Sequence, residues 1–259
     1  MPGRLITLTT DFGVRDPFVG VMKGVILGIC PDARLVDLTH EIDRQDVRGA
    51  QLAIESAVGF FPPGSVHLAV VDPGVGSARR PLALESGGRR FVGPDNGLFT
   101  FALTDPGWTA VTLEAPRYRL PEVSRTFHGR DVFAPAAAHL ARGVALAELG
   151  PPARDLVRQP LPVARREGAR LLGEVLAVDR FGNLITSITV AQLAGAPDVA
   201  VEVAGRSLGA PRESYLEGER DRAAPIMGSQ GRLEIYVRDG DARALLGAGP
   251  GTPVSVTLG

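Results

Sequence analysis

The sequence predicts an α/β protein in which an N-terminal domain with a parallel sheet precedes a smaller C-terminal antiparallel β-barrel-like domain. Strand and helix patterns alternate early in the chain, a stretch rich in proline and arginine interrupts them, and short strand patterns separated by turn residues follow. We therefore expect an α/β domain at 1–155, a linker at 156–169 and a β-rich domain at 170–259.

The elements of the N-terminal domain are indicated by hydrophobic spacing. Runs rich in Ile, Val and Leu indicate buried strands, and apolar residues three and four positions apart indicate helices. In chain order these are a strand at 5–8, a helix at 17–29, a strand from Leu35, a helix at 47–60, strands at 66–71, 91–92 and 110–113, and a helix at 132–142. Alternation of this kind predicts parallel strands with helices across the sheet.

The second half of the chain differs in composition and in the length of its hydrophobic segments. Residues 151–168 read PPARDLVRQPLPVARREG, and their prolines and charges are typical of a connector. The segments after it are short and bounded by turn residues, which predicts a small antiparallel domain. The expected strands lie at 171–178, 183–188, 199–203, 232–237 and 254–258.

Composition excludes several classes of protein. The formal net charge is -1 and the arginines are spread along the chain, which leaves no basic block for nucleic acid or an anionic membrane. Cys30 is the only cysteine, so an intrachain disulfide, a thiolate zinc cluster and an iron–sulfur site cannot form. Neither a secretory leader nor an apolar run of about 18 residues is visible. We expect a cytoplasmic protein with no membrane or nucleic-acid partner.

Carboxylates follow each of the first three expected strands. The strands run into Thr9–Gly13, Asp37–Glu41 and Asp72–Ser77, and Asp11 lies in the first of these loops. Ligands of parallel sheets bind beyond the carboxyl ends of the strands, so the three loops predict a site at one edge. The alternative is that these residues cap helices or form Asx turns.

The third of these loops is the most unusual. Its proline and two glycines permit a tight path, and Arg79 follows closely enough for its guanidinium to fold back toward the Asp72 carboxylate. The loop lacks both the dinucleotide fingerprint and the Walker pattern, so a nucleotide phosphate is not implied.

The histidines carry a weaker signal. His128 precedes the expected helix at 132–142, and such a loop histidine is more often a solvated or hydrogen-bonded residue than a catalyst. His40, His67 and His139 show no metal-binding spacing, so we expect neither a metal nor a cofactor.

Two loops of the C-terminal domain stand out. Asp179–Asn183 and Gly228–Gly231 are both consistent with hairpin turns in which glycine supplies positive φ. As a binding site, Phe181 offers a stacking face, Asn183 an amide for an adenine edge, and Asp179 a partner for an ammonium group. The spacing alone leaves both interpretations open.

Seven segments form a distinctive set in this order: LTTDFG at 8–13, DLTHEI at 37–42, VVDPGVGSARR at 70–80, GPDNGL at 93–98, TFHGRDVFAP at 126–135, DRFGNLITSI at 179–188 and GSQGRLEI at 228–235. The set resembles the S-adenosylmethionine (SAM) hydroxide adenosyltransferases, or SAM hydrolases, which are related to the SAM-dependent fluorinase and chlorinase. The resemblance implies hydrolysis of SAM to adenosine and methionine. It also implies a homotrimer with sites between the first domain of one subunit and the second domain of its neighbour.

The resemblance also implies roles for individual residues. The set implied for catalysis is Asp72, Arg79 and His128, and the set implied for substrate binding is Asp11, Asp179, Phe181, Asn183, Ser229, Glu234 and Val237. The halogenases lack an aspartate in the loop resembling DPGVGS and lack the histidine, and they carry an aromatic ring where this chain has Gln45.

The implied reaction needs a positioned nucleophile more than an acid, because the sulfonium leaves as a neutral thioether. Water must attack the ribose 5′ carbon in line with sulfur. We expect Asp72 and His128 to orient the water by accepting hydrogen bonds and Arg79 to stabilise the developing hydroxide. The alternatives are halide transfer, a non-catalytic SAM or adenosine sensor, and a metal-dependent hydrolase that uses His40.

Overall fold

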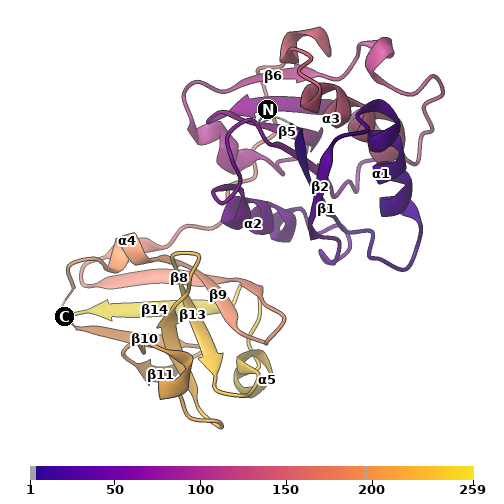
Figure 1. The fold of residues 1–259 in the computed structure, drawn as a ribbon. Helices are drawn as coiled ribbons and strands as arrows, with labels where there is room; N and C mark the ends of the chain where they lie inside the picture. Colours follow the sequence, from indigo (N-terminus) through magenta and orange to yellow (C-terminus); the bar gives the residue numbers. More distant parts are fainter. Residues whose placement is uncertain (1–3, 197) are drawn as a thin grey trace. The chain divides into compact units, whose positions relative to one another are not determined.

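The computed structural model describes residues 4–196 and 198–259 and divides into two compact units between Pro160 and Leu161 (Figure 1). The first unit is α/β and the second is mostly antiparallel β, as the sequence predicts. The expected linker at 156–169 contains a strand, β7 (Arg165–Glu167), which pairs with the start of β8 (Arg170–Val178). Gly168, at φ +60°, makes the turn of that hairpin.

The N-terminal unit is built on a six-stranded mixed sheet with the order β2-β1-β3-β5-β4-β6. Its strands are β1 (Leu5–Thr10), β2 (Arg34–Thr39), β3 (Val66–Val70), β4 (Pro81–Ser86), β5 (Arg89–Pro94) and β6 (Thr109–Thr112). The first four in this order run parallel, whereas β4 is antiparallel to both neighbours. The hairpin from β4 to β5 turns at Gly87 and Gly88, at φ +55° and +71°, which suits the tight turns that connect hairpins.

Helices cover both faces of this sheet. They are α1 (Phe18–Ile29), α2 (Val47–Val58) and α3 (Ala134–Ala141), and a π-helical turn, η3 (Gly129–Phe133), leads into α3. Alternate residues of β3 point to opposite faces, so Leu68 packs with α1 and α3, whereas Ala69 packs with α2. Short 3-10 turns occur at η1 (Thr100–Thr104), η2 (Pro116–Tyr118) and η4 (Leu146–Glu148).

A buried threonine–histidine pair lies inside the N-terminal unit. Thr7 Oγ1 of β1 is 2.8 Å from His67 Nδ1 of β3, and both residues are about 1% exposed. Burial, and secondly the charge of Arg89, lowers the pKa of His67 to about 4. His67 is therefore a neutral core residue at physiological pH.

The C-terminal unit is a curled antiparallel sheet with the order β11-β10-β14-β8-β9-β13-β12. The strands besides β7 and β8 are β9 (Leu184–Thr189), β10 (Val199–Val203), β11 (Arg206–Gly209), β12 (Ala223–Met227), β13 (Arg232–Val237) and β14 (Pro253–Leu258), with short helices α4 (Val190–Leu193), η5 (Tyr215–Glu217) and α5 (Ala242–Leu246). The register shifts between Val175 and Ala177, where β8 pairs with β9, and such a shift bends a strand. Val175, Leu184 and Leu233 form part of a core inside this barrel-like sheet.

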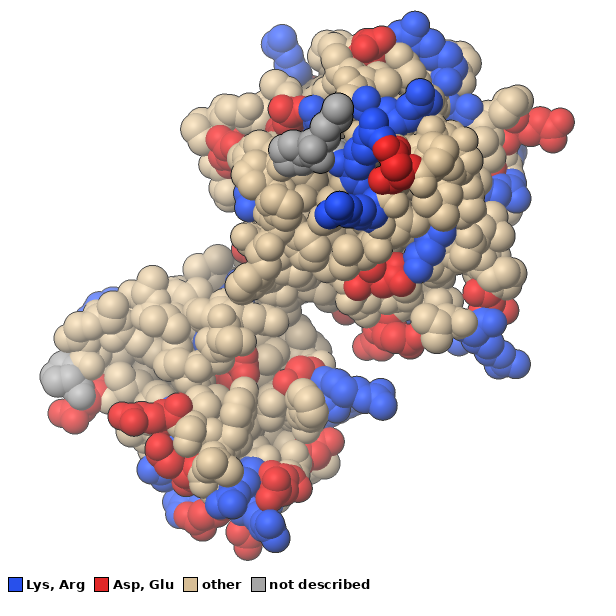
Figure 2. All heavy atoms as spheres, in the orientation of Figure 1, with Lys and Arg blue, Asp and Glu red and all other residues tan. Residues whose placement is uncertain are grey.

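The surface carries charges of both signs. Acidic side chains lie among the basic ones on the face drawn in Figure 2. Among the residues described, no helix is both long and apolar enough to cross a membrane.

Candidate active site

A cavity of about 380 Å³ opens in the N-terminal unit beside the carboxyl ends of β1 and β3. It is lined by Asp11, Phe12, Phe18, Arg44, Gln45, Val70, Asp72, Pro73, Val75, Thr126, Phe127, His128 and Gly129. Two of the three carboxylate-bearing loops place their aspartate there. The loop after β2 instead contributes Arg44 and Gln45, while Asp37 accepts a 2.6 Å hydrogen bond from Lys23 Nζ.

The glycine-rich loop folds back as expected from its composition. Val75 N donates to Asp72 O and Ser77 N donates to Gly74 O, which makes two successive turns. Gly76 lies at φ +77°, and a Cβ at this position would be 2.5 Å from the carbonyl oxygen of Arg125. The position therefore requires glycine for its conformation and for space.

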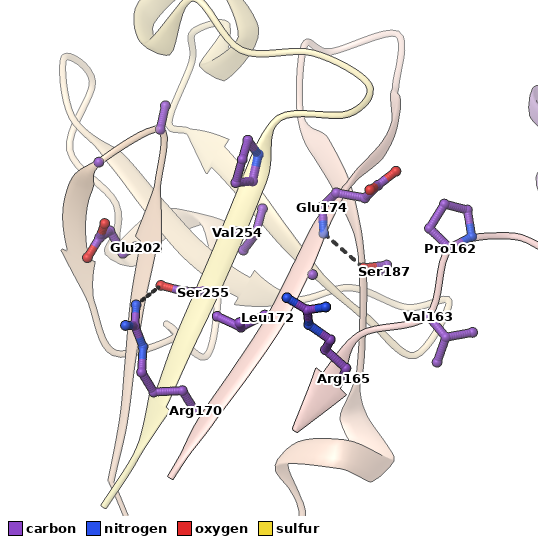
Figure 3. Close-up of a pocket in the computed structure, with 14 residues that line it drawn as sticks. Pro162, Val163, Arg165, Arg170, Leu172, Glu174, Ser187, Glu202, Val254 and Ser255 are labelled. Carbon is purple, nitrogen blue, oxygen red and sulfur yellow. Dashed lines mark hydrogen bonds between the residues drawn. The ribbon is translucent and has the colours of Figure 1, made fainter. Parts of the chain in front are cut away.

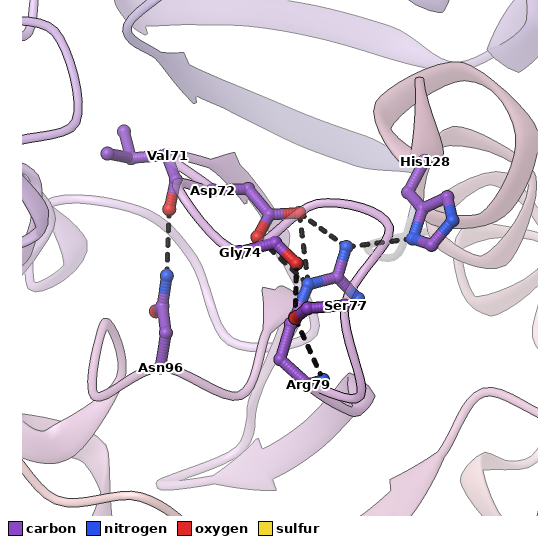
Figure 4. Close-up of polar contacts among 7 residues, drawn as sticks. All are labelled: Val71, Asp72, Gly74, Ser77, Arg79, Asn96 and His128. Atoms are coloured by element: carbon purple, nitrogen blue, oxygen red, sulfur yellow. Dashed lines mark hydrogen bonds and ion pairs between the residues drawn. The ribbon is translucent and has the colours of Figure 1, made fainter. Parts of the chain in front are cut away.

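This path brings Asp72, Arg79 and His128 together (Figure 4). Arg79 Nε donates to Asp72 Oδ1 and Oδ2 at 2.9 and 3.0 Å, and Arg79 Nη2 also donates to Oδ2. The same Nη2 lies 2.8 Å from His128 Nδ1. The side chains of Arg79 and Asp72 are only 9% and 5% exposed, so this ion pair is shielded from water.

Arg79 is also fixed by its aromatic neighbour. Its Cζ lies 5.1 Å from the centre of the Phe133 ring in η3, which is a cation–π distance. Arg79 Nη1 is buried and has no hydrogen-bond partner among the described residues. An unpaired buried donor costs free energy, so an acceptor that reached Nη1 would find a strong partner. Arg79 itself is not among the residues that line the cavity.

The contact with Arg79 settles the tautomer of His128. A guanidinium only donates, so His128 Nδ1 must accept and the neutral ring carries its proton on Nε2. Its single acceptor nitrogen is therefore occupied. The expectation that His128 accepts a hydrogen bond from water does not fit this geometry, in which Nε2–H is a donor.

Burial lowers the pKa of His128, Arg79 lowers it further, and the opposing effect of Asp72 is smaller. A lowered pKa favours the neutral ring. The neutral ring accepts the hydrogen bond from Arg79 at a pH above this pKa, and protonation removes the contact as the pH falls below it. We expect kcat to be constant at neutral pH and to decline only below pH 6.5, the ordinary value. A pH–kcat profile whose acid limb has its midpoint at or above this value would contradict the assignment.

Asp11 is held from the loop after β2. The backbone N of Gln45 donates to Asp11 Oδ2 at 2.8 Å, and Gln45 itself has an unusual φ of +65°. A non-glycine residue in this region is strained, and such strain often marks a functional loop. The sequence offered no sign of this contact, because it depends on two loops meeting in space.

The C-terminal unit has its own pocket, of about 450 Å³. It is lined by Asp179, Phe181, Asn183, Tyr215, Leu216, Tyr236, Val237, Arg238, Asp239 and Gly240. Phe181 is 75% exposed, so its ring is free to stack on a ligand. Sequence reasoning missed Tyr215 and Tyr236, since neither lies in a recognisable motif.

The other residues expected to bind substrate in the C-terminal unit either make hydrogen bonds within a turn or lie outside the pocket lining. Asp179 accepts hydrogen bonds of 2.8–2.9 Å from Phe181 N, Asn183 N and Asn183 Nδ2. Its carboxylate therefore stabilises the turn at 179–183. Ser229 and Glu234 do not line the pocket. Glu234 is buried and accepts a 3.3 Å hydrogen bond from Tyr215 Oη, and burial raises its pKa.

A further cavity of about 520 Å³ lies elsewhere in the C-terminal unit, against β8 and β14 (Figure 3). Arg170 Nη2 donates to Ser255 Oγ at 3.0 Å, and Arg165 pairs with Glu167 at 3.0 Å. Glu174 and Glu202 also line it, so its charges are mixed. It contains none of the residues expected from the sequence to act in a site.

Comparison with known proteins identifies the family. The SAM hydroxide adenosyltransferase N-terminal domain matches residues 6–150, and the C-terminal domain of the same family matches residues 173–255. The chain belongs to the SAM hydroxide adenosyltransferase family. The resemblance inferred from the seven motifs is thereby confirmed.

A hydrolase relative matches more of the chain than a fluorinase relative does. An (R)-S-adenosyl-L-methionine hydrolase of Thermus thermophilus is 47% identical, with 97% of this chain and 98% of the relative covered. A fluorinase of Actinoplanes is 31% identical over 71% of each chain. A crystal structure of an uncharacterized conserved protein from Thermotoga maritima matches with a TM-score of 0.91 and 32% identity, covering 97% of this chain and 99% of that one.

Proposed function

We propose that this chain hydrolyses SAM to adenosine and L-methionine. The observation that carries the proposal is the hydrogen-bonded Asp72–Arg79–His128 cluster. Its Asp72–Arg79 ion pair is buried, and Asp72 and His128 line the cavity. The membership of the family supports the substrate, and the names of the hydrolase relatives support the (R) sulfonium epimer.

The reaction forms one bond and breaks one. A water oxygen bonds to the ribose 5′ carbon as the carbon–sulfur bond breaks, and the electron pair stays on sulfur as methionine leaves. One proton is released to solvent. Holding the water in line with sulfur supplies much of the rate enhancement, because orientation removes an entropic cost.

Each member of the cluster has a distinct role in this proposal. Arg79 Nη1, the unpaired buried donor, binds the oxygen and stabilises the negative charge that develops on it. Asp72 fixes the guanidinium and accepts a hydrogen bond from the water. His128 fixes Nη2 through Nδ1 and offers Nε2–H to the site.

Substrate binding draws on both units. We propose that Asp11 binds the ribose hydroxyls, and that the C-terminal set binds methionine and adenine. This set consists of Asp179, Phe181, Asn183, Ser229, Glu234 and Val237. In a homotrimer these residues would come from a neighbouring subunit, and sedimentation equilibrium giving the mass of one or two chains would contradict that arrangement.

The single cysteine suits a reducing compartment, so we place the protein in the cytoplasm. Fractionation of cells that express the chain tests this placement. Recovery outside the cytoplasmic fraction would contradict it.

Chromatography of the products tests the activity. SAM incubated with the purified protein should give equal amounts of adenosine and methionine, with and without molar chloride. Formation of 5′-chloro-5′-deoxyadenosine would instead identify halide transfer. Tight binding of SAM that stays intact over long incubation would identify a sensor.

A further inference from the structure

A buried side-chain network lies directly behind the loop that carries Asp11. Thr10 Oγ1, at the end of β1, is 2.9 Å from His40 Nδ1, and the two residues are 0% and 5% exposed. His40 Nε2 lies 3.1 Å from Asp37 Oδ1, outside good hydrogen-bonding alignment. Lys23 Nζ, from α1, holds the other oxygen of Asp37 at 2.6 Å.

The network holds the backbone directly after Asp11. Phe12 N donates to Thr10 Oγ1 at 3.3 Å, and Gly13 N donates to His40 O at 2.8 Å. The Asp11 carboxylate then meets Gln45 N, five residues beyond His40 in the same loop. One histidine thus connects the loop after β1 to the loop after β2.

We propose that Thr10 and His40 are positioning residues that aim the Asp11 carboxylate into the cavity. This inference rests on the proposed function, in which Asp11 binds ribose. Both residues are too buried to contact substrate, so they act only through Asp11 and its neighbours. Asp37 and Lys23 anchor the far side of the His40 ring.

Strand β1 supplies a matched control. Thr7 makes the same Oγ1–Nδ1 contact with a buried histidine, His67, but lies three residues earlier, away from the cavity lining. Thr7→Val and Thr10→Val therefore remove the same group and the same kind of Oγ1–Nδ1 hydrogen bond from the same strand, and Thr10→Val also removes the 3.3 Å contact with Phe12 N. A merely structural role predicts the same consequences for both.

The two variants should differ in substrate binding. We expect Thr10→Val to raise KM for SAM about tenfold with kcat within about twofold of wild type, because a misplaced ribose contact weakens ground-state and transition-state binding alike. Thr7→Val should leave both constants unchanged. Equal KM values for the two variants, measured at equal folded fractions, would overturn the proposal.

A double-mutant cycle tests whether the effect passes through Asp11. In the Asp11→Ala background, Thr10→Val should change KM by less than about twofold, since the group it aims is gone. Another tenfold rise in that background would show independent action and would also overturn the proposal.

The affinity for adenosine separates this inference from the proposed function. If wild-type protein binds adenosine in calorimetry but does not turn over SAM, the proposed function fails. The double-mutant cycle of Thr10→Val and Asp11→Ala is then measured as adenosine affinity instead of KM. Wild-type protein that turns over SAM while Thr10→Val matches Thr7→Val overturns the positioning role alone. Wild-type protein that neither turns over SAM nor binds adenosine overturns both.

Discussion

Replacing Arg79 by alanine is expected to lower kcat for SAM hydrolysis by roughly a thousandfold. The substitution removes the donor proposed to stabilise the attacking oxygen and also the group that holds Asp72 and His128 in place. Steady-state kinetics with SAM under saturating conditions measures the effect.

The next residue in the chain is a control for the loss of an arginine. Arg80 Nε donates to Asp95 Oδ2 at 2.8 Å, whereas Arg79 contacts Asp72 and His128. Arg80→Ala should keep kcat within about threefold of wild type, as expected of a residue outside the reacting groups. An Arg79→Ala enzyme with kcat within tenfold of wild type would remove Arg79 from the mechanism.

Replacing Asp72 by asparagine is expected to lower both activity and stability. Breaking a buried ion pair leaves an uncompensated guanidinium, which costs about 3 kcal/mol of unfolding free energy. The freed Arg79 also loses its orientation, so kcat should fall by at least about a hundredfold. Denaturant unfolding and single-turnover kinetics measure the two effects separately.

Asp95 provides the comparison that separates the two effects. Its side chain is 3% exposed. Asp95 Oδ2 lies 2.6 Å from Arg80 Nη2, and Asp95 Oδ1 accepts a 2.9 Å hydrogen bond from Val157 N. Asp95→Asn should therefore destabilise the N-terminal unit while leaving kcat per folded molecule near wild type. The destabilisation should be smaller than for Asp72→Asn, because the Arg80 side chain is 37% exposed and water can solvate it. If both variants lost kcat equally, the role of Asp72 would be structural.

Much of the fold could be predicted because the central strands are hydrophobic. The runs at β1 and β3 are buried on both faces, so they appear in the sequence as mostly apolar segments, which Thr7 and His67 interrupt. Strand β4 was missed because Pro81 and Glu85 interrupt its pattern, and its antiparallel pairing depends on the Gly87–Gly88 turn. Strand β12 was also missed, because it directly follows a charged stretch, ERDR at 219–222, that resembles a loop.

The site could be predicted only in part, because local sequence patterns indicate contacts within a loop but not contacts between distant loops. A glycine-rich turn followed by Arg79 indicated a contact with Asp72 that the structure contains. His128 joined them through family resemblance, and its tautomer follows only from the Arg79 contact. The pairing of Thr10 with His40 connects residues 30 positions apart, and no local pattern predicts such a contact.

The source of the new oxygen tests the central claim most directly. Hydrolysis in water enriched in oxygen-18 should give adenosine that is two mass units heavier at its 5′ hydroxyl, together with unlabelled methionine. The Arg79→Ala enzyme should give almost none of this product. Unlabelled adenosine, or label in methionine, would contradict attack of water on the 5′ carbon.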